Sequence, residues 1–326
     1  MNCYQESPPI LRDFLAYMSN IEGKSQKTVN EYFCDLRTFF RFLKLSRSMT
    51  TKETEFNDIP IDDVDINLIK TVTLNDGYNF MLFLQQDRDN KPVTRRRKVS
   101  SLSSFFKYLT KKKMLLESNP IDALESPKVG KRLPKYLELD QCYTLLNSVD
   151  GPFKERDYCI LVLFLNCGMR LSELCAINYN SITPEGKLRI IGKGNKERIV
   201  YLNDACINAV KKYMAVRPNE GLHDKHALFI SRNMNRMSPS AVQRLVQKYL
   251  AKSGLDGQGF SVHKLRHTAA TLMYQYGGVD IRILKEILGH ENLGTTEIYT
   301  HLSDSQMEKA LKSNPLANIG TNSNGK

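Results

Sequence analysis

Apolar residues recur every three or four positions along most of the chain, which is the spacing of one face of an α-helix. In the first third, aromatic residues dominate this pattern, and the segment Gly23-Lys24-Ser25 interrupts it. Residues 44–66 are acidic and poorly periodic, and we expect a loop there. Helices are predicted from residue 9 up to this glycine, over Thr28–Leu43 and Leu74–Gln86, and again beyond Lys91.

Two of these predicted helices resemble each other. Thr28 precedes the aromatic pair Phe39-Phe40 by eleven residues, and Thr94 precedes Phe105-Phe106 by the same interval. A small bundle containing two similar helices explains this repeat, with each threonine as an N-terminal cap. Because a helix N-terminus presents unpaired N–H groups, it can also bind a phosphate.

A basic segment punctuated by prolines follows, Ser126 to Pro134, and predicts a linker. We expect an N-terminal helical domain over 1–126, a linker over 127–138, a second domain over 139–312 and a disordered tail over 313–326. The second domain is predicted to be mainly helical with one small β-hairpin, so the fold class is α+β. Its predicted helices are Asp140–Val149, Arg156–Leu165, Ala205–Val216, Pro239–Lys252 and a last stretch, His263–Tyr299; its strands are Leu188–Ile191 and Glu197–Leu202.

The composition indicates a polyanionic binding partner. The chain has 326 residues and a net charge of +12. Nine lysines or arginines and no acid lie between Lys91 and Lys113. A solvated basic surface is the alternative, but such a local excess suits a surface that follows phosphates.

Hydropathy and cysteine content favour a cytoplasmic protein. The longest apolar run, Tyr158–Leu165, is too short to span a bilayer, and the first residues lack the features of a signal peptide. Seven scattered cysteines form no metal-binding spacing. We therefore expect buried thiols, for instance at Cys159, Cys167 and Cys175, and no disulfide framework.

Two familiar motifs are present only in part. Gly192-Lys193-Gly194 resembles a P-loop, but the spacing from Gly186 is one residue too long and the required Ser or Thr is missing. His263 and His267 have the spacing of a zinc-peptidase helix, but Lys264 stands where its glutamate should be. The sequence thus predicts neither ATP nor a metal ion as a cofactor.

Single polar residues are weaker signals. Arg170 follows a glycine at the end of the most apolar helix, where Glu173 can orient it, although a surface arginine is the ordinary alternative. Arg266 lies three residues after His263, on the same helix face. Tyr299 is one of fifteen tyrosines, and by itself it is more typical of a core residue than of a nucleophile.

Taken together, these residues form a specific pattern. Arg170, Lys193, His263-x-x-Arg266, His290 and Tyr299 occur in this order, within the local sequences GMRLSEL, GKGNKER, HKLRHT and LGH-x5-T-x2-Y. The pattern resembles the tyrosine recombinase, or phage-integrase, family, and within it the Xer-like integrases. The resemblance covers residues 9–312, with two departures. The match is poorest at residues 44–76, where this chain looks longer and more acidic than a compact Xer protein, and Cys167 stands where the family more often has threonine.

This resemblance implies a helical, SAM-like core-binding domain, a catalytic domain and DNA cleavage through a 3′-phosphotyrosine at Tyr299. Arg170 and Arg266 would bind the two non-bridging oxygens of the phosphate, because a guanidinium offers a planar, permanently charged fork. His263 is the candidate base, Lys193 the candidate acid, and His290 a donor to a non-bridging oxygen. Such an enzyme needs neither ATP nor metal, since the phosphotyrosine conserves the bond energy.

The partner expected from this pattern is double-stranded DNA with a specific recombination site. The candidates for DNA contact are Arg95, Arg96, Arg97 and Lys98, and Gln243 and Arg244 on a later helix. We expect a homo-tetramer on paired sites, or a hetero-tetramer with a second recombinase, in which the segment Asp304–Leu311 docks on a neighbour. A type IB topoisomerase-like nicking enzyme and a non-catalytic DNA-binding protein are the alternative functions.

Overall fold

The chain folds as two separate units, Met1–Lys131 and Arg132–Lys326, and their division lies inside the segment expected to be a linker. A computed structural model describes residues 7–51, 53–128, 130, 135–191 and 197–289. The predicted helix Asp304–Leu311 and the predicted tail lie outside these residues. Within the described part, no helix is long and apolar enough to cross a membrane.

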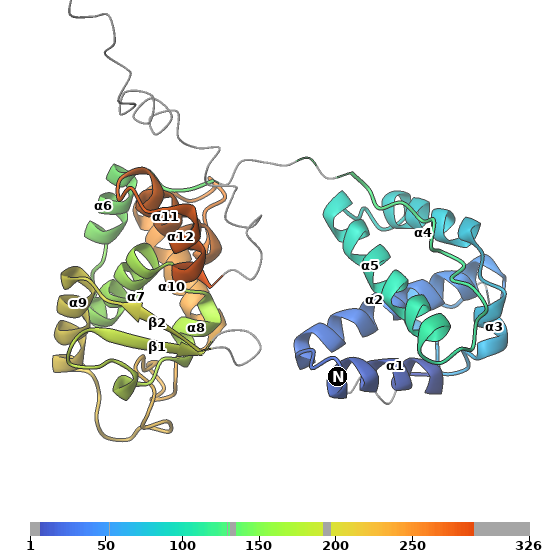
Figure 1. Cartoon of the computed structure of the whole chain (residues 1–326), viewed down its shortest axis with the longest axis horizontal. Helices are drawn as coiled ribbons and strands as arrows, with labels where there is room; N and C mark the ends of the chain where they lie inside the picture. The colour runs from blue at the N-terminus through green and yellow to red at the C-terminus, as the bar shows by residue number, and fades with distance from the viewer. Residues whose placement is uncertain (1–6, 52, 129, 131–134, 192–196, 290–326) are drawn as a thin grey trace, which may run out of the picture. The chain divides into compact units, whose positions relative to one another are not determined.

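The first unit is a bundle of helices packed around α2 (Figure 1). Its core contains the two aromatic pairs of the repeat: the rings of Phe39 and Phe106 lie 6.2 Å apart, those of Phe40 and Phe105 5.7 Å apart, and both contacts are edge-to-face. This arrangement suits the charge distribution of aromatic rings. The elements are α1 Pro9–Asn20, α2 Gln26–Ser46, the short 3-10 helix η1 Phe56–Asp58, α3 Ile66–Lys70, α4 Leu74–Gln86 and α5 Pro92–Lys111.

The two threonines of the repeat are not the helix caps, so that prediction was wrong. α2 begins earlier than expected, and the Ser25 hydroxyl accepts a hydrogen bond from the Thr28 backbone N–H at 3.3 Å. In α5 the cap position is Lys91, whose side chain makes no capping bond, and Pro92 opens the helix. Proline suits this first position because its fixed φ is helical and its missing N–H has no partner there.

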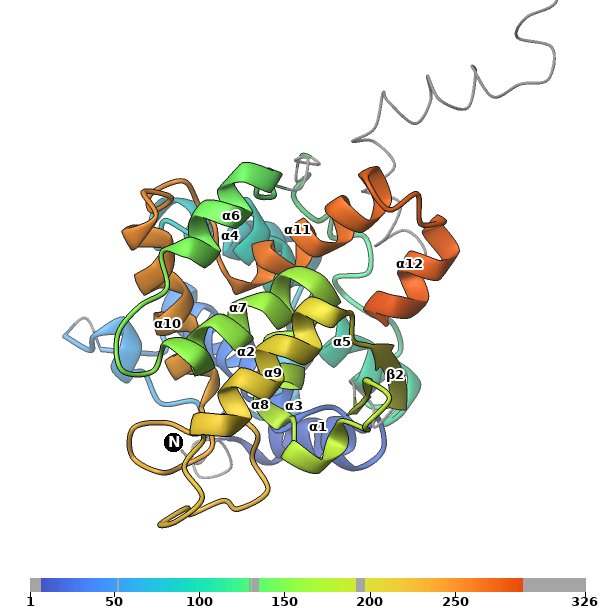
Figure 2. The ribbon, with the colours of Figure 1, turned by 90° about the vertical axis from the view of Figure 1, so that its left-hand side faces the viewer.

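The second unit surrounds α7 with further helices. α7 is buried along most of its length, and it contacts α9 and α11, which lie on either side of it in Figure 2. The continuous apolar run predicted a buried helix, and the structure confirms it. The elements are α6 Leu139–Asn147, α7 Lys154–Cys167, α8 Leu171–Ala176, the 3-10 helix η2 Tyr179–Ser181, β1 Lys187–Ile191, β2 Glu197–Tyr201, α9 Asp204–Val216, α10 Pro239–Lys252, α11 Val262–Gln275 and α12 Ile281–Leu288.

The fold class is the predicted one, mainly α with a small antiparallel hairpin. β1 and β2 pair in register, with Ile190 opposite Arg198. Ser238 caps α10 as expected, accepting a hydrogen bond from the Ala241 N–H at 3.2 Å. Cys159, Cys167 and Cys175 are buried free thiols, also as expected.

The last predicted helical stretch is interrupted. α11 ends at Gln275, and α12 begins only at Ile281. Gly278 between them has a φ of +61°, a conformation that glycine adopts without strain. Apolar periodicity continues across this break, and therefore the sequence pattern did not reveal it.

Candidate active site

Arg170 lies at a sharp corner between two helices. α7 ends at Cys167; the next residue, Gly168, has a φ of +57°, and a Cβ there would lie 2.7 Å from a methyl group of Leu288. Arg170 then occupies the position before α8. Its backbone N–H donates to Glu173 Oε2 at 2.8 Å, and its Nη1 donates to Oε1 at 2.7 Å. Glu173 thus orients Arg170, as the sequence suggested.

Arg266 reaches the same place from α11. Its side chain is only 4% exposed. Nη1 donates to the Gly168 carbonyl at 2.8 Å, and Nη2 donates to the Leu288 carbonyl at 2.6 Å. Nη1 also lies 3.9 Å from Glu173 Oε2. The two arginines, far apart in the sequence, therefore meet at one carboxylate.

A third arginine, Arg198 of β2, completes this cluster. Its Nη1 and Nη2 donate to the two oxygens of Glu173 at 2.7 and 2.9 Å. Its Nε donates to the Ile287 carbonyl at 3.2 Å. Sequence reasoning did not select Arg198 as a functional residue, although it closes the same GKGNKER segment that contains Lys193.

The carboxylate of Glu173 is ionised at the centre of these arginines. Burial by itself would raise the pKa of Glu173, but hydrogen bonds from Arg198 and Arg170 and the charge of Arg198 outweigh burial and lower it to about 2. Three guanidinium groups around one carboxylate leave a surplus of two positive charges in this cluster. Such a surplus favours binding of an anion.

The C-terminus of α12 closes the cluster. Its successive carbonyls Ile287, Leu288 and Gly289 accept hydrogen bonds from Arg198, Arg266 and Arg170 respectively. The last carbonyls of a helix lack partners within the helix and carry the negative end of its dipole. Arginines therefore stabilise this terminus, and they also fix the backbone at Gly289, the residue before His290.

His263 lies one turn before Arg266 on α11 and is exposed. Its ring is 4.6 Å from that of His267, edge-to-face. Partial loss of hydration lowers the pKa of His263, and the positive charges of Arg266, Lys264 and Arg170 lower it further. A neutral imidazole can accept a proton, which a general base must do.

The structure therefore brings together Arg170 and Arg266, with His263 one turn away. Lys193, His290 and Tyr299 lie outside the described residues. Their neighbours in the chain are described: β1 and β2 lie on either side of the segment 192–196, which contains Lys193, and Gly289 directly precedes His290. Placing these three side chains in the site stays a prediction.

The basic residues at the start of α5 lie in different environments. Arg96 and Arg97 are exposed, although Arg97 also donates to Asp35. Arg95 donates to Gln85. Lys98 is buried, and its Nζ donates to Asp35 Oδ1 at 3.1 Å. This geometry argues against a direct DNA contact by Lys98, because its ammonium already has a buried partner.

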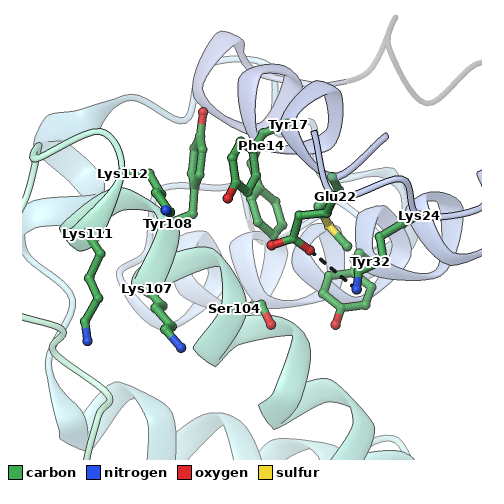
Figure 3. A pocket seen from close by; sticks show the side chains of 11 residues that line it. Phe14, Tyr17, Glu22, Lys24, Tyr32, Ser104, Lys107, Tyr108, Lys111 and Lys112 are labelled. Carbon is green, nitrogen blue, oxygen red and sulfur yellow. Dashed lines mark ion pairs between the residues drawn. The ribbon is translucent and has the colours of Figure 1, made fainter. Parts of the chain in front are cut away.

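Further cations on α5 border a surface pocket of about 490 Å³ in the first unit (Figure 3). Lys107 and Lys111 extend from successive turns of α5 beside Lys112, and the rings of Tyr17 and Tyr32 form part of the wall. One lysine of the pocket, Lys24, pairs with Glu22 at 3.6 Å. The basic surface of α5 therefore continues well past the four residues that the sequence suggested.

Gln243 and Arg244 are both exposed on α10. Arg244 lines a surface cavity of about 650 Å³ together with Arg232 and Lys248. Sequence reasoning did not select these two cations. Arg232 belongs to an irregular loop, and Lys248 lies on α10, one turn after Arg244. The cavity gives the second unit a basic face of its own.

Comparison with known proteins identifies the family. The phage integrase family model matches residues 135–306. Tyrosine recombinase XerC of Caldanaerobacter subterraneus subsp. tengcongensis is 53% identical over 310 residues, which cover 95% of this chain and 88% of that protein. The chain belongs to the phage integrase family. It is a site-specific tyrosine recombinase, an enzyme that breaks and rejoins DNA strands.

More distant relatives agree with this assignment. XerC of Syntrophus aciditrophicus is 35% identical, with 91% of this chain and 94% of that protein covered. Among solved structures, XerH bound to its difH substrate has a TM-score of 0.67 at 22% identity, over 93% of this chain and 83% of that chain. A lambda integrase tetramer on a Holliday junction has a TM-score of 0.63 at 18% identity, over 89% and 76%. These structures share the recombinase fold.

Proposed function

We propose that this recombinase cuts duplex DNA by attack of Tyr299 on a scissile phosphate held at the Glu173 arginine cluster. The observation that carries the proposal is the meeting of Arg170 and Arg266 at one buried carboxylate beside the residue preceding His290. A surplus of fixed positive charge in a water-poor place stabilises the charge that builds up on a phosphate oxygen during displacement.

The proposed step is a transesterification. The phenol oxygen of Tyr299 forms a bond to phosphorus, and the bond from phosphorus to the 5′ oxygen breaks. His263 accepts the phenol proton, and Lys193 gives a proton to the leaving 5′ oxygen. The 5′ hydroxyl of the partner strand then attacks phosphorus and gives up its proton, the bond from phosphorus to the Tyr299 oxygen breaks, and the phenol regains a proton as the diester is restored. No ATP is consumed and no metal is required.

The two arginines differ in how they can reach the phosphate. The side chain of Arg170 is 35% exposed, and so its guanidinium is accessible to an anion. Arg266 is almost fully buried, and its charge acts from behind the carbonyls that it binds. Direct contact between the phosphate and Arg266 therefore depends on where bound DNA lies relative to the end of α12.

Both units contribute to DNA binding in this proposal. On α5 it rests mainly on Arg96 and Arg97, because both are exposed, whereas Arg95 is half-buried and Lys98 is buried. On α10 it rests on Gln243 and Arg244. Contacts from arginine and lysine to phosphates position the duplex, and only a few side chains can read bases.

Similarity to the relatives supports a proposal for the biological setting. Full-length similarity to XerC favours resolution of chromosome or plasmid dimers over integration or excision of a mobile element. We propose a tetramer on two paired sites, formed by this chain alone or with a second recombinase. The structural relative crystallised as a tetramer on a junction supports the first part of this idea. We further propose that it acts on chromosomal DNA in the cytoplasm.

Trapping the covalent intermediate tests the proposal. A nicked suicide duplex carries the sequence that the protein enriches from genomic fragments. We expect a covalent DNA adduct with the parent and with Tyr4→Phe, and none with Tyr299→Phe. An adduct that survives Tyr299→Phe removes Tyr299 as the nucleophile.

Two further measurements separate the alternative functions. In a two-site assay, a nicking-closing enzyme relaxes supercoils but yields no recombinant junctions, whereas a recombinase yields them. A non-catalytic DNA-binding protein predicts that Arg170→Ala leaves every activity intact. We expect Arg170→Ala to abolish adduct formation while DNA binding persists.

A further inference from the structure

Arg198 occupies an unusual position for a residue without a proposed chemical role. It lies on β2, two residues after the segment 192–196, which contains Lys193. Its side chain turns away from solvent and is 14% exposed. Burying a third guanidinium beside Arg170 and Arg266 costs free energy through like-charge repulsion and desolvation. A specific function at this place would account for an arrangement with this cost.

The contacts of Arg198 join three parts of the site. Its fork engages both oxygens of Glu173, at 2.7 and 2.9 Å, and so fixes the plane of the carboxylate. That carboxylate in turn holds Nη1 and the backbone N–H of Arg170. The Nε of Arg198 binds the Ile287 carbonyl at the end of α12.

Arg198 also packs against the residue that precedes His290. A Cβ on Gly289 would lie 3.1 Å from Nη1 and 3.3 Å from Cδ of Arg198. Gly289 has a φ of +64°, so both its conformation and its close contact with Arg198 favour glycine. One side chain of β2, the strand that follows the segment 192–196, therefore contacts both the carboxylate that supports Arg170 and the end of α12.

We propose that Arg198 is a positioning residue, which keeps Arg170, β2 and the end of α12 in one arrangement by clamping Glu173. This inference rests on the proposed roles of these residues in strand cleavage. Lysine cannot replace Arg198 fully, because an ammonium on a flexible stem cannot bind both carboxylate oxygens and the Ile287 carbonyl in one plane.

The first test measures cleavage. Full-length parent, Arg198→Gln and Arg198→Lys are incubated with the nicked suicide duplex described above, at saturating protein. We expect Arg198→Gln to form the adduct about 10- to 100-fold more slowly, because small displacements of catalytic groups have effects of this size. Its affinity for the duplex should change less than about threefold. Arg198→Lys should recover only part of the rate.

A matched variant separates positioning from general loss of stability. Arg217 is buried in the same unit and donates to the Leu228 and Ala227 carbonyls at 3.1 and 2.6 Å, outside the cluster. Arg217→Gln should lower thermal stability at least as much as Arg198→Gln, yet its folded fraction should form the adduct at the parent rate. Equal rate losses in both variants would overturn the proposal, as would a parent-like rate in Arg198→Gln or Arg198→Lys.

The second test needs no DNA. Removing Arg198 removes a major cause of the low pKa of Glu173, while the burial that raises this pKa remains. Urea unfolding of Arg198→Gln should therefore lose less stability between pH 6 and pH 3 than that of the parent or Arg217→Gln, because a carboxyl whose folded pKa approaches its unfolded value binds protons equally in both states. An unchanged acid profile would show that Arg198 does not clamp Glu173.

The controls also distinguish this inference from the proposed function. An adduct that depends on Tyr299, together with a parent-like Arg198→Gln, refutes the clamp alone. An adduct retained in Tyr299→Phe refutes the proposed nucleophile, and the acid profile still decides whether Arg198 holds Glu173.

Discussion

Two buried carboxylates, one in each unit, gather cations in different ways. Asp35 on α2 binds Arg97, Lys98 and the Ser101 hydroxyl, and all three partners come from α5. Glu173 binds arginines from its own helix corner, from β2 and from α11. Asp35 therefore joins one pair of helices, whereas Glu173 joins segments from across its unit.

The partners also differ in how firmly they keep their charge. Burial lowers the pKa of Lys98, even though Asp35 opposes the shift. Arginine does not deprotonate in proteins, so the three arginines at Glu173 keep their surplus charge. In this chain, the Asp35 carboxylate links two helices through partners on a single element. The Glu173 carboxylate is outnumbered by permanent cations from three segments, an arrangement that favours an anion site.

Removing the Glu173 carboxylate should have the largest effect. Glu173→Gln leaves three neighbouring guanidinium groups without their anion and releases Arg170 from its orientation. We expect adduct formation to fall at least about 100-fold, and the free energy of unfolding to fall by about 3–5 kcal/mol. Suicide-substrate assays and urea unfolding measure the two effects. Glu185→Gln, which removes an exposed acid of the same unit, should do neither.

Removing the Asp35 carboxylate should lower stability without changing the rate of DNA cleavage. Asp35→Asn leaves buried Lys98 without its charge partner, and we expect a loss of about 3 kcal/mol in urea unfolding. On saturating duplex, the rate of adduct formation should equal that of the parent. A large rate loss in Asp35→Asn would remove the distinction between the two clusters.

Acid should weaken the Glu173 cluster in a defined window. The pKa of Glu173 is about 2 in the folded chain and 4.5 ordinarily, so its ionisation contributes stability that is complete above about pH 5. This contribution, at most about 3 kcal/mol, is lost as the pH falls from 4.5 toward 2. Urea unfolding between pH 6 and pH 3 measures it. Glu173→Gln should flatten this part of the profile, and an equally steep profile in that variant would assign the effect to other groups.

The smallest expected effect concerns the glycine beside the cluster. Gly289→Ala introduces a side chain at a φ of +64° and against Arg198, with an expected cost of about 1–3 kcal/mol. Gly278→Ala is the matched control, since its φ is +61° but nothing lies within 4 Å of its Cβ position. Thermal unfolding of the two variants should show a greater loss at Gly289, and only Gly289→Ala should slow adduct formation. Equal losses would mean that contact with Arg198 contributes nothing.

Local sequence signals predicted much of the fold. Leu74–Gln86 and Pro239–Lys252 are helices with the predicted bounds, because apolar spacing, caps and breakers act within a few residues. The same local reasoning failed at the threonine caps and at the break after Gln275. A neighbouring serine and a proline began the two helices instead, and paired glycines interrupted a pattern that stayed apolar on both sides.

Order and spacing along the chain were sufficient to indicate the family, the reaction and the six candidate residues, because the chemistry of phosphate transfer restricts residue types strongly. They were not sufficient to find the arrangement that supports the site. Arg198 and the carbonyls of Ile287 to Gly289 act through contacts between segments distant in sequence. Lys98 was expected at the surface from its place in a basic run, but packing buries it. Only the tertiary structure decides these points, because desolvation, charge surplus and hydrogen-bond partners depend on which segments meet.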